Sequence, residues 1–197
     1  MNFNTDRYIL NKIYIFVLLK SNSMPFDTQQ VLENNEVILT PLVDEYYNQL
    51  LNTSLDPILW EHHPISNAYT TVGFDKFYKE AKAIGSLVII DKIKDNVIGS
   101  TRFYNYNELE SSVVIGHTFI AREYWGSGYN KSIKKLMLDY AFTHVNKVVF
   151  YVVEENIRSQ KALEKLGAVA KGNIIRNYES KELKCILFEI EKGEQLC

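Results

Sequence analysis

A glycine-rich loop is the place in this sequence where residue types and spacing most directly predict chemistry. Residues 124–130 read YWGSGYN and stand immediately before an amphipathic stretch. Glycines at positions 126 and 128 let backbone N–H groups converge without side chains in the way. Together with the first free N–H groups of a following helix, and with its dipole, they predict a cradle for a phosphate or another anion.

The loop differs from two familiar nucleotide-binding sequences. It lacks the Gly-Lys-Ser/Thr of a Walker A loop and the third glycine of a dinucleotide-binding G-x-G-x-x-G. On its spacing alone, the loop is as compatible with a plain turn as with a phosphate site. A nucleotide-binding domain of either familiar kind is not indicated.

A second motif begins at Asn156, where the chain reads NIRSQKALEKLG up to Gly167. Asparagine is a favoured N-cap, so we expect a helix over 156–166. Helical spacing places Ser159 on the same side as Leu166, together with Ala162 or Leu163. A serine on such a face either packs harmlessly or points into a cleft as a proton donor.

The elements around these motifs form two groups. Before the loop, the pattern predicts mostly strands, with a hairpin about the turn at 94–96; the expected strands are 36–40, 86–90, 97–104 and 111–120. The last of these contains Gly116, which predicts a bulge or a close backbone approach. Two helices are expected among them, 45–51 after Asp44 and 74–84 before Gly85, separated by an irregular loop over 55–72.

After the loop, helices and strands alternate. The sequence predicts a helix over 130–145, a strand over 148–153 that is buried on both faces, the helix over 156–166, and strands over 170–178 and 184–191. The first of these helices has an apolar stripe of Ile133, Leu136, Met137, Tyr140 and Ala141, with Lys131, Lys134, Lys135 and Asp139 elsewhere. Antiparallel strands followed by a strand-helix-strand-helix unit predict an α+β domain with a mixed sheet.

Composition limits the class of protein. The 197 residues suit one domain, and 46% hydrophobic with 23% charged residues is ordinary for a soluble protein. A net charge of -2 and a pI near 6.1 argue against a general nucleic-acid binder. Cys185 and Cys197 form no disulfide framework and no metal-binding spacing, so we expect a reduced, cytoplasmic protein without a metal site.

The first 23 residues are expected to be an extension, with Met24 as an alternative start and the domain over 24–197. Residues 8–19 are largely apolar but fall short of the roughly 20 residues that span a bilayer. No small-residue cleavage site follows them. A strand or helix packed on the domain is the other interpretation, and we expect no membrane anchor.

Taken together, the two motifs resemble the signature of the GNAT superfamily of N-acetyltransferases, and most closely its RimJ/RimL-type branch. Sequences of that branch commonly read Tyr/Phe-Trp-Gly-x-Gly and Asn-x-x-Ser-x-x-Ala-x-x-x-Leu-Gly. The similarity runs from about residue 36 to 191 and is most specific over 115–167. It implies a GNAT fold: a mixed, mostly antiparallel sheet of about six to seven strands, flanked by helices, with a splayed central strand pair that holds the cofactor.

The resemblance also implies an activity. A member of this family moves the acetyl group of acetyl-coenzyme A (acetyl-CoA) to a primary amine within a ternary complex. The resemblance implies a protein N-terminus or a small amine as the acceptor here, and a monomer or homodimer as the oligomeric state. The residues carried over as cofactor-binding are Phe119, Ile120 and Ala121 along the strand, Trp125, Gly126, Ser127, Gly128, Tyr129 and Asn130 in the loop, and Asn156. Ser159 is the candidate acid that protonates the departing thiolate.

Three positions depart from the family pattern. Glu123 replaces a usual Gln or Arg, Val114 stands where many relatives carry a glutamate base, and Leu163 stands where other members carry a tyrosine acid. The general base is therefore unassigned. His117 is the next candidate, because an unperturbed pKa of about 6.5 suits the task. Since side chains alternate along a strand, His117 faces the cleft only if Ile115 and Phe119 face it too.

Other interpretations stay open at this point. A histidine in a strand is more often structural, bonded to its surroundings, than catalytic, so His117 is also interpreted that way. Glu61, His62 and His63 are interpreted either as an ordinary surface loop or as part of the acceptor site. Several aromatic residues either line that site or belong to the core: Trp60, Tyr69, Phe74, Tyr104 and Tyr106. Because Val114 removes a usual base, a catalytically inactive CoA-binding regulatory module is the alternative function.

Overall fold

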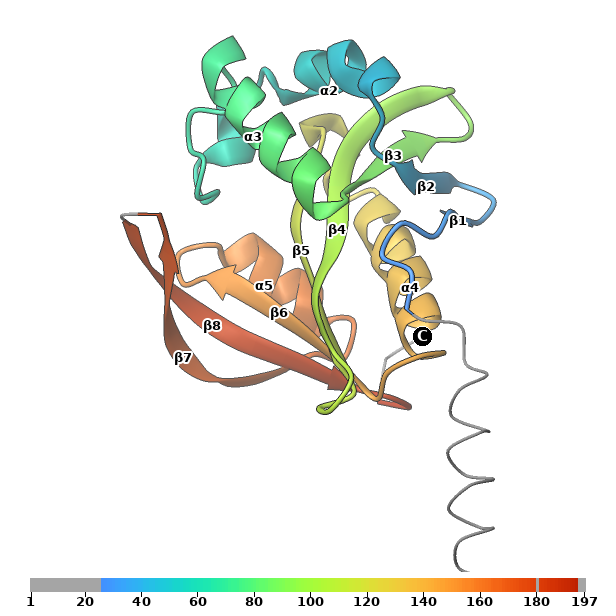
Figure 1. Cartoon of the computed structure of the whole chain (residues 1–197), viewed down its shortest axis with the longest axis vertical. Helices are drawn as coiled ribbons and strands as arrows, with labels where there is room; N and C mark the ends of the chain where they lie inside the picture. Colours follow the sequence, from blue (N-terminus) through green and yellow to red (C-terminus); the bar gives the residue numbers. More distant parts are fainter. Residues whose placement is uncertain (1–25, 180, 195–197) are drawn as a thin grey trace, which may run out of the picture.

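Eight strands form one sheet in residues 26–179 and 181–194, the part of the chain that the computed structural model describes (Figure 1). Their order across the sheet is β1-β2-β3-β4-β5-β6-β8-β7, and every neighbouring pair is antiparallel except β5 and β6. The strands are β1 (Leu32–Glu33), β2 (Val37–Pro41), β3 (Leu87–Asp91), β4 (Asn96–Asn107), β5 (Ser112–Ile120), β6 (Lys147–Val153), β7 (Val169–Tyr178) and β8 (Lys181–Glu191).

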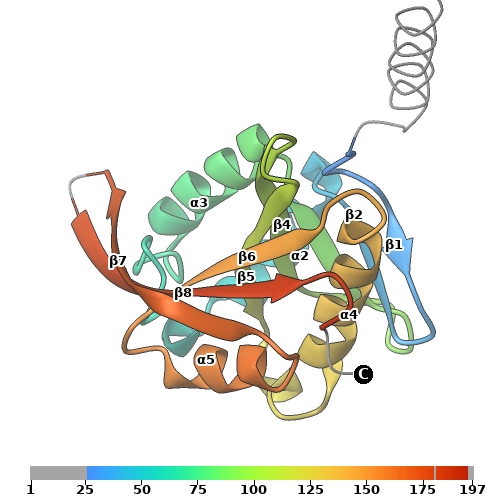
Figure 2. The same cartoon turned by 90° about the horizontal axis from the view of Figure 1, so that it is seen from below.

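Helices cover both faces of this sheet. As Figures 1 and 2 show, α3 (Thr71–Ile84) lies on one side, and α4 (Tyr129–Ala141) and α5 (Ile157–Glu164) lie on the other. The helix α2 (Tyr47–Ser54) packs beside α3. Short helical turns are η1 (Asp44–Tyr46), η2 (Pro57–Trp60) and η3 (Arg122–Tyr124).

Each face has its own apolar core, because each helix layer buries one stripe. The larger core lies under α4 and α5 and includes Ile133, Met137 and Phe188. The second lies under α2 and α3 and includes Trp60 and Phe74. In β6, Val148, Phe150 and Val152 belong to the larger core, and the alternate residues Val149, Tyr151 and Val153 are buried or half-buried.

The ends of α3 show how local sequence fixes an element. The Thr70 hydroxyl accepts a hydrogen bond from the Gly73 N–H at 3.2 Å, which is an N-cap. Gly85 then adopts φ +84° and ends the helix in the left-handed conformation that glycine allows. The sequence predicted this end correctly and placed the start three residues late.

The parallel pair β5–β6 is short, and this shapes the site. Pairing joins 112–114 to 147–149 and then stops. Beyond Val114, β5 pairs with β4, and beyond Val149, β6 pairs with β8. The two central strands therefore diverge, as the family resemblance implied.

The α+β class and the mostly antiparallel sheet are confirmed. The sheet has eight strands rather than six or seven, because β1 is only two residues long and leaves no periodic pattern in the sequence. The expected extension at 1–23 lies outside the described residues. Within the described ranges, no helix is long and apolar enough to cross a membrane.

Candidate active site

A cavity of about 680 Å³ lies where β5 and β6 diverge. Both motifs of the sequence reach it, although they are far apart along the chain. Nine of the twelve expected site residues line it: His117, Phe119, Ile120, Trp125, Gly126, Gly128, Asn130, Asn156 and Ser159. The other three, Ala121, Ser127 and Tyr129, are not part of its lining.

The loop before α4 is held in place by three hydrogen bonds. The Tyr124 hydroxyl donates to the buried Asp91 carboxylate at 2.9 Å, and the Trp125 indole N–H donates to the Ile120 carbonyl at 2.9 Å. The Ser127 hydroxyl donates back to the Tyr124 carbonyl at 2.6 Å. Ser127 therefore shapes the loop with its side chain, which explains why this side chain does not line the cavity.

Asp91 anchors the loop as a charged group. Burial alone would raise its pKa, but hydrogen bonds from the Ile93 and Lys94 N–H groups and from the Tyr124 hydroxyl outweigh this effect. The pKa of Asp91 therefore lies below its usual value, and the carboxylate stays ionised at neutral pH. Tyr124, two residues before Gly126, is therefore fixed to the sheet by a charge-assisted hydrogen bond.

The glycine pair has the backbone conformation and the open space that the predicted cradle requires. Gly126 and Gly128 have φ values of +75° and +95°, and a Cβ at either position would meet no protein atom within 4 Å. Gly128 is the N-cap of α4 and provides no side-chain cap, so the first N–H groups of the helix are left for a ligand. This open space and these donors fit the diphosphate of CoA.

Basic side chains surround the cradle end of the cavity. Its lining includes Lys131, Arg158, Lys161 and Lys165. The Arg158 guanidinium lies 3.3 Å from the centre of the Trp125 ring, so α5 and the loop are in direct contact. This positive field suits a ligand that carries several phosphate charges.

The start of α5 places both of its predicted residues on the cavity. The Asn156 side-chain oxygen accepts a hydrogen bond from the Ser159 N–H at 3.1 Å, which confirms the N-cap. This cap uses the oxygen of the amide, and its NH₂ group can donate to a carbonyl of a ligand. Ser159 is half-buried and lines the same wall.

A β-bulge reshapes β5 at the middle of the cavity. Arg102 pairs with Gly116 and Ser100 pairs with Phe119, so two residues of β5 stand opposite one of β4. His117 lies in this bulge with φ +47°. A Cβ on Gly116 would lie 3.1 Å from the Tyr104 ring. The bulge and the close approach that Gly116 predicted are both present.

The bulge also changes the alternation of side chains along β5. Phe119 packs in the core under α2 and α3, whereas Ile115 packs in the core under α4. The two belong to different cores because the extra residue shifts the alternation of side chains. Ile115, His117 and Phe119 nevertheless all line the cavity, so His117 does reach the cleft.

His117 and His63 lie together with their ring centres 5.6 Å apart. Burial, helped by the positive charge of Arg102, lowers the pKa of His117 to about 2 and that of His63 to about 3. The His63 Nδ1 accepts from the Ile65 N–H, and its Nε2 is buried without a partner. Both imidazoles are neutral at neutral pH, so the ordinary pKa assumed for a base at His117 is not present.

Tyr104 is the aromatic candidate that reaches the cavity. Its ring contacts His117 edge-on, with centres 5.4 Å apart. Trp60 and Phe74 are core residues, and Tyr69 and Tyr106 are exposed elsewhere. Glu61, His62 and His63 all line the cavity, so the loop over 55–72 does border the site.

Two of the three positions that depart from the family pattern, Val114 and Leu163, are buried. Val114 is buried at the last parallel pair of β5 and β6. Leu163 is buried and lines the cavity beside Ser159. Neither side chain can transfer a proton, so neither can take the role of the glutamate base or the tyrosine acid that relatives carry there.

Lys134 is a cavity residue that the sequence analysis missed. Its side chain is 5% exposed and donates to the Thr118 hydroxyl at 2.6 Å, behind the bulge. The expected stripe assigned it to the polar face of its helix. However, Lys134 and Leu138, which both lie outside the expected stripe, are buried, so the buried face differs from the stripe. Burial lowers the pKa of Lys134 to about 7.

We expect Lys134→Met to stabilise the protein most at and below neutral pH. The folded pKa is about 7 against 10.5 for an exposed lysine, so the folded state binds fewer protons between these values. Stability of the wild type therefore rises with pH through this window, and the cost below it is on the order of a few kcal/mol. Thermal unfolding of both proteins from pH 6 to pH 10 should show curves that converge as pH rises.

Lys135→Met is the matched control for this measurement. Lys135 is exposed and pairs with Asp139 at 2.7 Å, so its removal should produce no convergence of this kind. Parallel curves for the wild type and Lys134→Met would show that Lys134 is not held with a lowered pKa.

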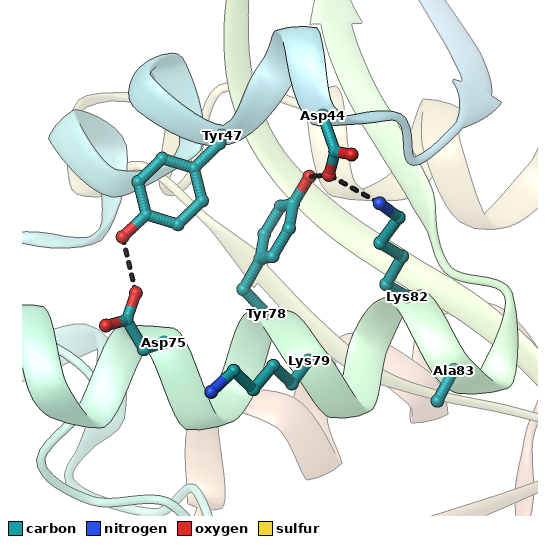
Figure 3. A pocket seen from close by; sticks show the side chains of 7 residues that line it. All are labelled: Asp44, Tyr47, Asp75, Tyr78, Lys79, Lys82 and Ala83. Atoms are coloured by element: carbon teal, nitrogen blue, oxygen red, sulfur yellow. Dashed lines mark hydrogen bonds and ion pairs between the residues drawn. The ribbon is translucent and has the colours of Figure 1, made fainter.

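A second hollow lies between the start of α2 and α3, and Figure 3 shows its lining. Asp44 accepts hydrogen bonds from the Tyr78 hydroxyl and the Lys82 ammonium, and Asp75 accepts one from the Tyr47 hydroxyl. These hydrogen bonds join η1 and the start of α2 to α3. We interpret this hollow as part of the helix interface and not as the active site.

Comparison with known proteins agrees with this geometry. The family model for the acetyltransferase (GNAT) domain matches residues 36–169, which is well over half of the chain. The chain belongs to the GNAT acetyltransferase family. Members of this family are acyltransferases that use acetyl-CoA, and the glycine cradle and diverging strands provide the place for it.

Three relatives illustrate the range within the GNAT family. A GCN5-related N-acetyltransferase from Brucella melitensis has a TM-score of 0.78 at 16% identity, over 88% of this chain and 85% of that one. A spermidine N-acetyltransferase from Vibrio cholerae, solved with CoA and spermine, has a TM-score of 0.64 at 20% identity, over 82% and 98%. A ribosomal-protein-S5-alanine acetyltransferase from Vibrio fischeri has a TM-score of 0.63 at 16% identity, over 85% and 100%.

Sequence similarity to curated proteins is more limited. A spermidine N(1)-acetyltransferase of Vibrio cholerae is 26% identical over 92 residues, which is 46% of this chain and 53% of that enzyme. The match thus spans about half the length of the curated relative. The similar GNAT proteins act on different amines, so they do not place the chain in the RimJ/RimL-type branch.

Proposed function

We propose that residues 24–197 are an N-acetyltransferase that moves the acetyl group of acetyl-CoA to a primary amine within a ternary complex. The observation that carries this proposal is the single cavity between β5 and β6. Both the glycine loop and a contacting cluster of His63, Tyr104 and His117 line it, and we call these two parts the cradle end and the acceptor end. A donor and an acceptor can therefore be held in one space at the same time.

The residues of the cradle end are assigned to cofactor binding. The N–H groups of Gly126 to Asn130 bind the diphosphate, and the Asn156 amide binds the pantetheine arm. Phe119, Ile120 and Ala121 are assigned to the wall along the pantetheine arm, where the partner strand has diverged. The Ile120 carbonyl already accepts from Trp125 and the Ala121 N–H donates to Ile98, so the remaining backbone groups of this segment would make the contact. Acetyl-CoA supplies the activated acyl group when it is bound.

Two residues are assigned to the chemistry. Ser159 donates a proton at its hydroxyl to the departing sulfur. His117 stays neutral, so we assign it the role of accepting a hydrogen bond from the acceptor amine and orienting it. A conjugate acid with a pKa of about 2 is too strong for the imidazole to remove a proton from an ammonium group.

The pH profile tests this assignment. The imidazoles of His117 and His63 do not titrate near neutrality, and Lys134, whose pKa is about 7, donates to Thr118 behind the bulge. We therefore expect kcat/KM to rise with pH until the acceptor itself is deprotonated. The apparent pKa of this rise in kcat/KM should therefore follow the pKa of the acceptor. It should be about 8 for a peptide α-amine and about 10 for a lysine-like amine. An apparent pKa near 6.5 for both acceptors would instead identify a base within the protein.

An acceptor panel read by release of free thiol tests the proposed function. It should include polyamines, amino sugars, amino acids and peptides with free N-termini, beside a calorimetric titration with CoA. Thiol release that requires one class of acceptor supports the proposal. CoA binding without turnover on any acceptor would favour an inactive regulatory module, and no CoA binding would contradict both.

We place the chain nearest the RimJ/RimL-type branch and in the cytoplasm as part of the same proposal. The Tyr124-Trp125-Gly126 start of the loop supports the branch, because it carries the pattern of that group. The lack of a disulfide framework in the sequence supports the compartment. Acetylation of peptide N-termini in the panel would test the branch.

A further inference from the structure

Arg102 is a buried cation behind the acceptor end of the cavity. It lies on β4 opposite Gly116, is 3% exposed, and its Nε has no hydrogen-bond partner. Burial lowers its pKa, but an arginine keeps its charge in proteins. Within the described ranges, none of the salt bridges includes Arg102.

A second guanidinium reaches the cavity at the same end. Arg176 of β7 lines it and lies 3.8 Å from the centre of the Tyr151 ring. It also contacts Tyr104, and the centre of the Tyr104 ring lies 5.8 Å from the Arg102 guanidinium. The salt bridges of the described residues do not include Arg176 either.

Acidic groups near this end are already engaged. Glu80 acts on Arg102 from beyond ion-pair distance and accepts a hydrogen bond from the Tyr178 hydroxyl. Glu61 lies 3.3 Å from the His62 ring nitrogen. Among the residues that line the cavity, Glu61 is the single carboxylate, beside six basic side chains: Lys131, Lys134, Arg158, Lys161, Lys165 and Arg176.

Four of these basic side chains, Lys131, Arg158, Lys161 and Lys165, suit the phosphate charges of CoA. The acceptor therefore meets Arg176 with Arg102 behind it, and these two cations favour one class of acceptor. A buried cation without a close counter-ion is costly, and a carboxylate would relieve the cost while matching the fork of a guanidinium. A polyamine would instead bring further ammonium charges against Arg176 and Arg102, and like charges disfavour a partner. An acceptor that carries a carboxylate beside its amine meets neither problem.

We propose that the acceptor is a small amino acid, whose carboxylate binds Arg176 while Arg102 supports it from behind. This inference rests on the proposed function and narrows its acceptor. Arg176 makes the direct contact, and Arg102 is a positioning residue that acts through Tyr104 and the local field. The amine is then held beside His117, on the side of the cavity that Tyr104 shares.

The test compares amino acids with their carboxamides, which differ in charge at equal size, beside spermidine. The wild type should prefer the free acid in kcat/KM. Arg176→Gln should raise KM for the acid by about 10- to 100-fold, the effect of one charge-assisted hydrogen bond. The same variant should change the carboxamide little. Arg122→Gln is the matched control, because Arg122 pairs with Asp56 at 2.7 Å and does not line the cavity.

Binding provides a readout that does not need turnover. The acid should raise the unfolding temperature of the CoA-loaded protein more than its carboxamide does, and both Arg176→Gln and Arg102→Met should abolish the difference. A preference for the carboxamide or for spermidine would overturn the inference and leave the proposed function standing. Discrimination in binding without any thiol release would support the carboxylate site while contradicting the proposed function.

Discussion

Replacing Gly128 by valine should weaken CoA binding by about 100-fold, because a diphosphate at this position would lose at least two charge-assisted hydrogen bonds. Gly128 has φ +95° and is the N-cap of α4. A side chain here would occupy the open space that the first N–H groups of the helix face. Titration calorimetry with CoA measures the effect directly.

Gly193→Val separates the loss of the cradle from backbone strain. Gly193 has the same φ of +95°, and a Cβ there also meets no atom within 4 Å, but it does not line the cavity. Both variants should lose a similar amount of stability from the left-handed conformation. Gly193→Val should nevertheless bind CoA like the wild type. Equal affinities for the two variants would mean that the glycine loop is not the phosphate site.

Ser159→Ala should reduce kcat by about 100-fold or more, the lower end of the effect of removing a general acid. The Ser159 N–H holds the Asn156 cap through the backbone, so the cap survives the substitution. CoA affinity should therefore change little. Steady-state kinetics by thiol release, together with calorimetry, gives both quantities.

Ser132→Ala is the matched control for this loss of a hydroxyl. Ser132 is also half-buried in the first turns of a helix, and it accepts a hydrogen bond from Asn34 away from the cavity. It should keep its turnover. Unchanged kcat in Ser159→Ala would show that water or another group protonates the departing thiolate.

The cradle and the α5 cap were predictable because their information is local. Two glycines before an apolar helical stripe determine backbone freedom and a helix start within a few residues. Asn156 likewise caps α5 by accepting a hydrogen bond from the N–H of Ser159, three residues later in the chain. Such features depend on neighbours in the sequence, and the structure places them where the sequence predicted.

The acceptor end was not predictable in the same way, because it depends on contacts between distant elements. The bulge moved His117 out of the expected alternation, and burial against Arg102 lowered its pKa. Arg102 of β4 and Arg176 of β7 both act on Tyr104, although their strands are not neighbours in the sheet. Lys134 was assigned to a polar face, since a lysine within a helix pattern gives no sign that its ammonium is buried.

One measurement tests the central claim most directly: the balance between free thiol and acetylated amine in a single reaction with acetyl-CoA. We predict that both products form in equal amounts, that the amine gains the mass of one acetyl group, and that neither forms without the acceptor. Thiol release that continues without an acceptor, or with an acceptor that stays unmodified, would contradict acetyl transfer by this cavity.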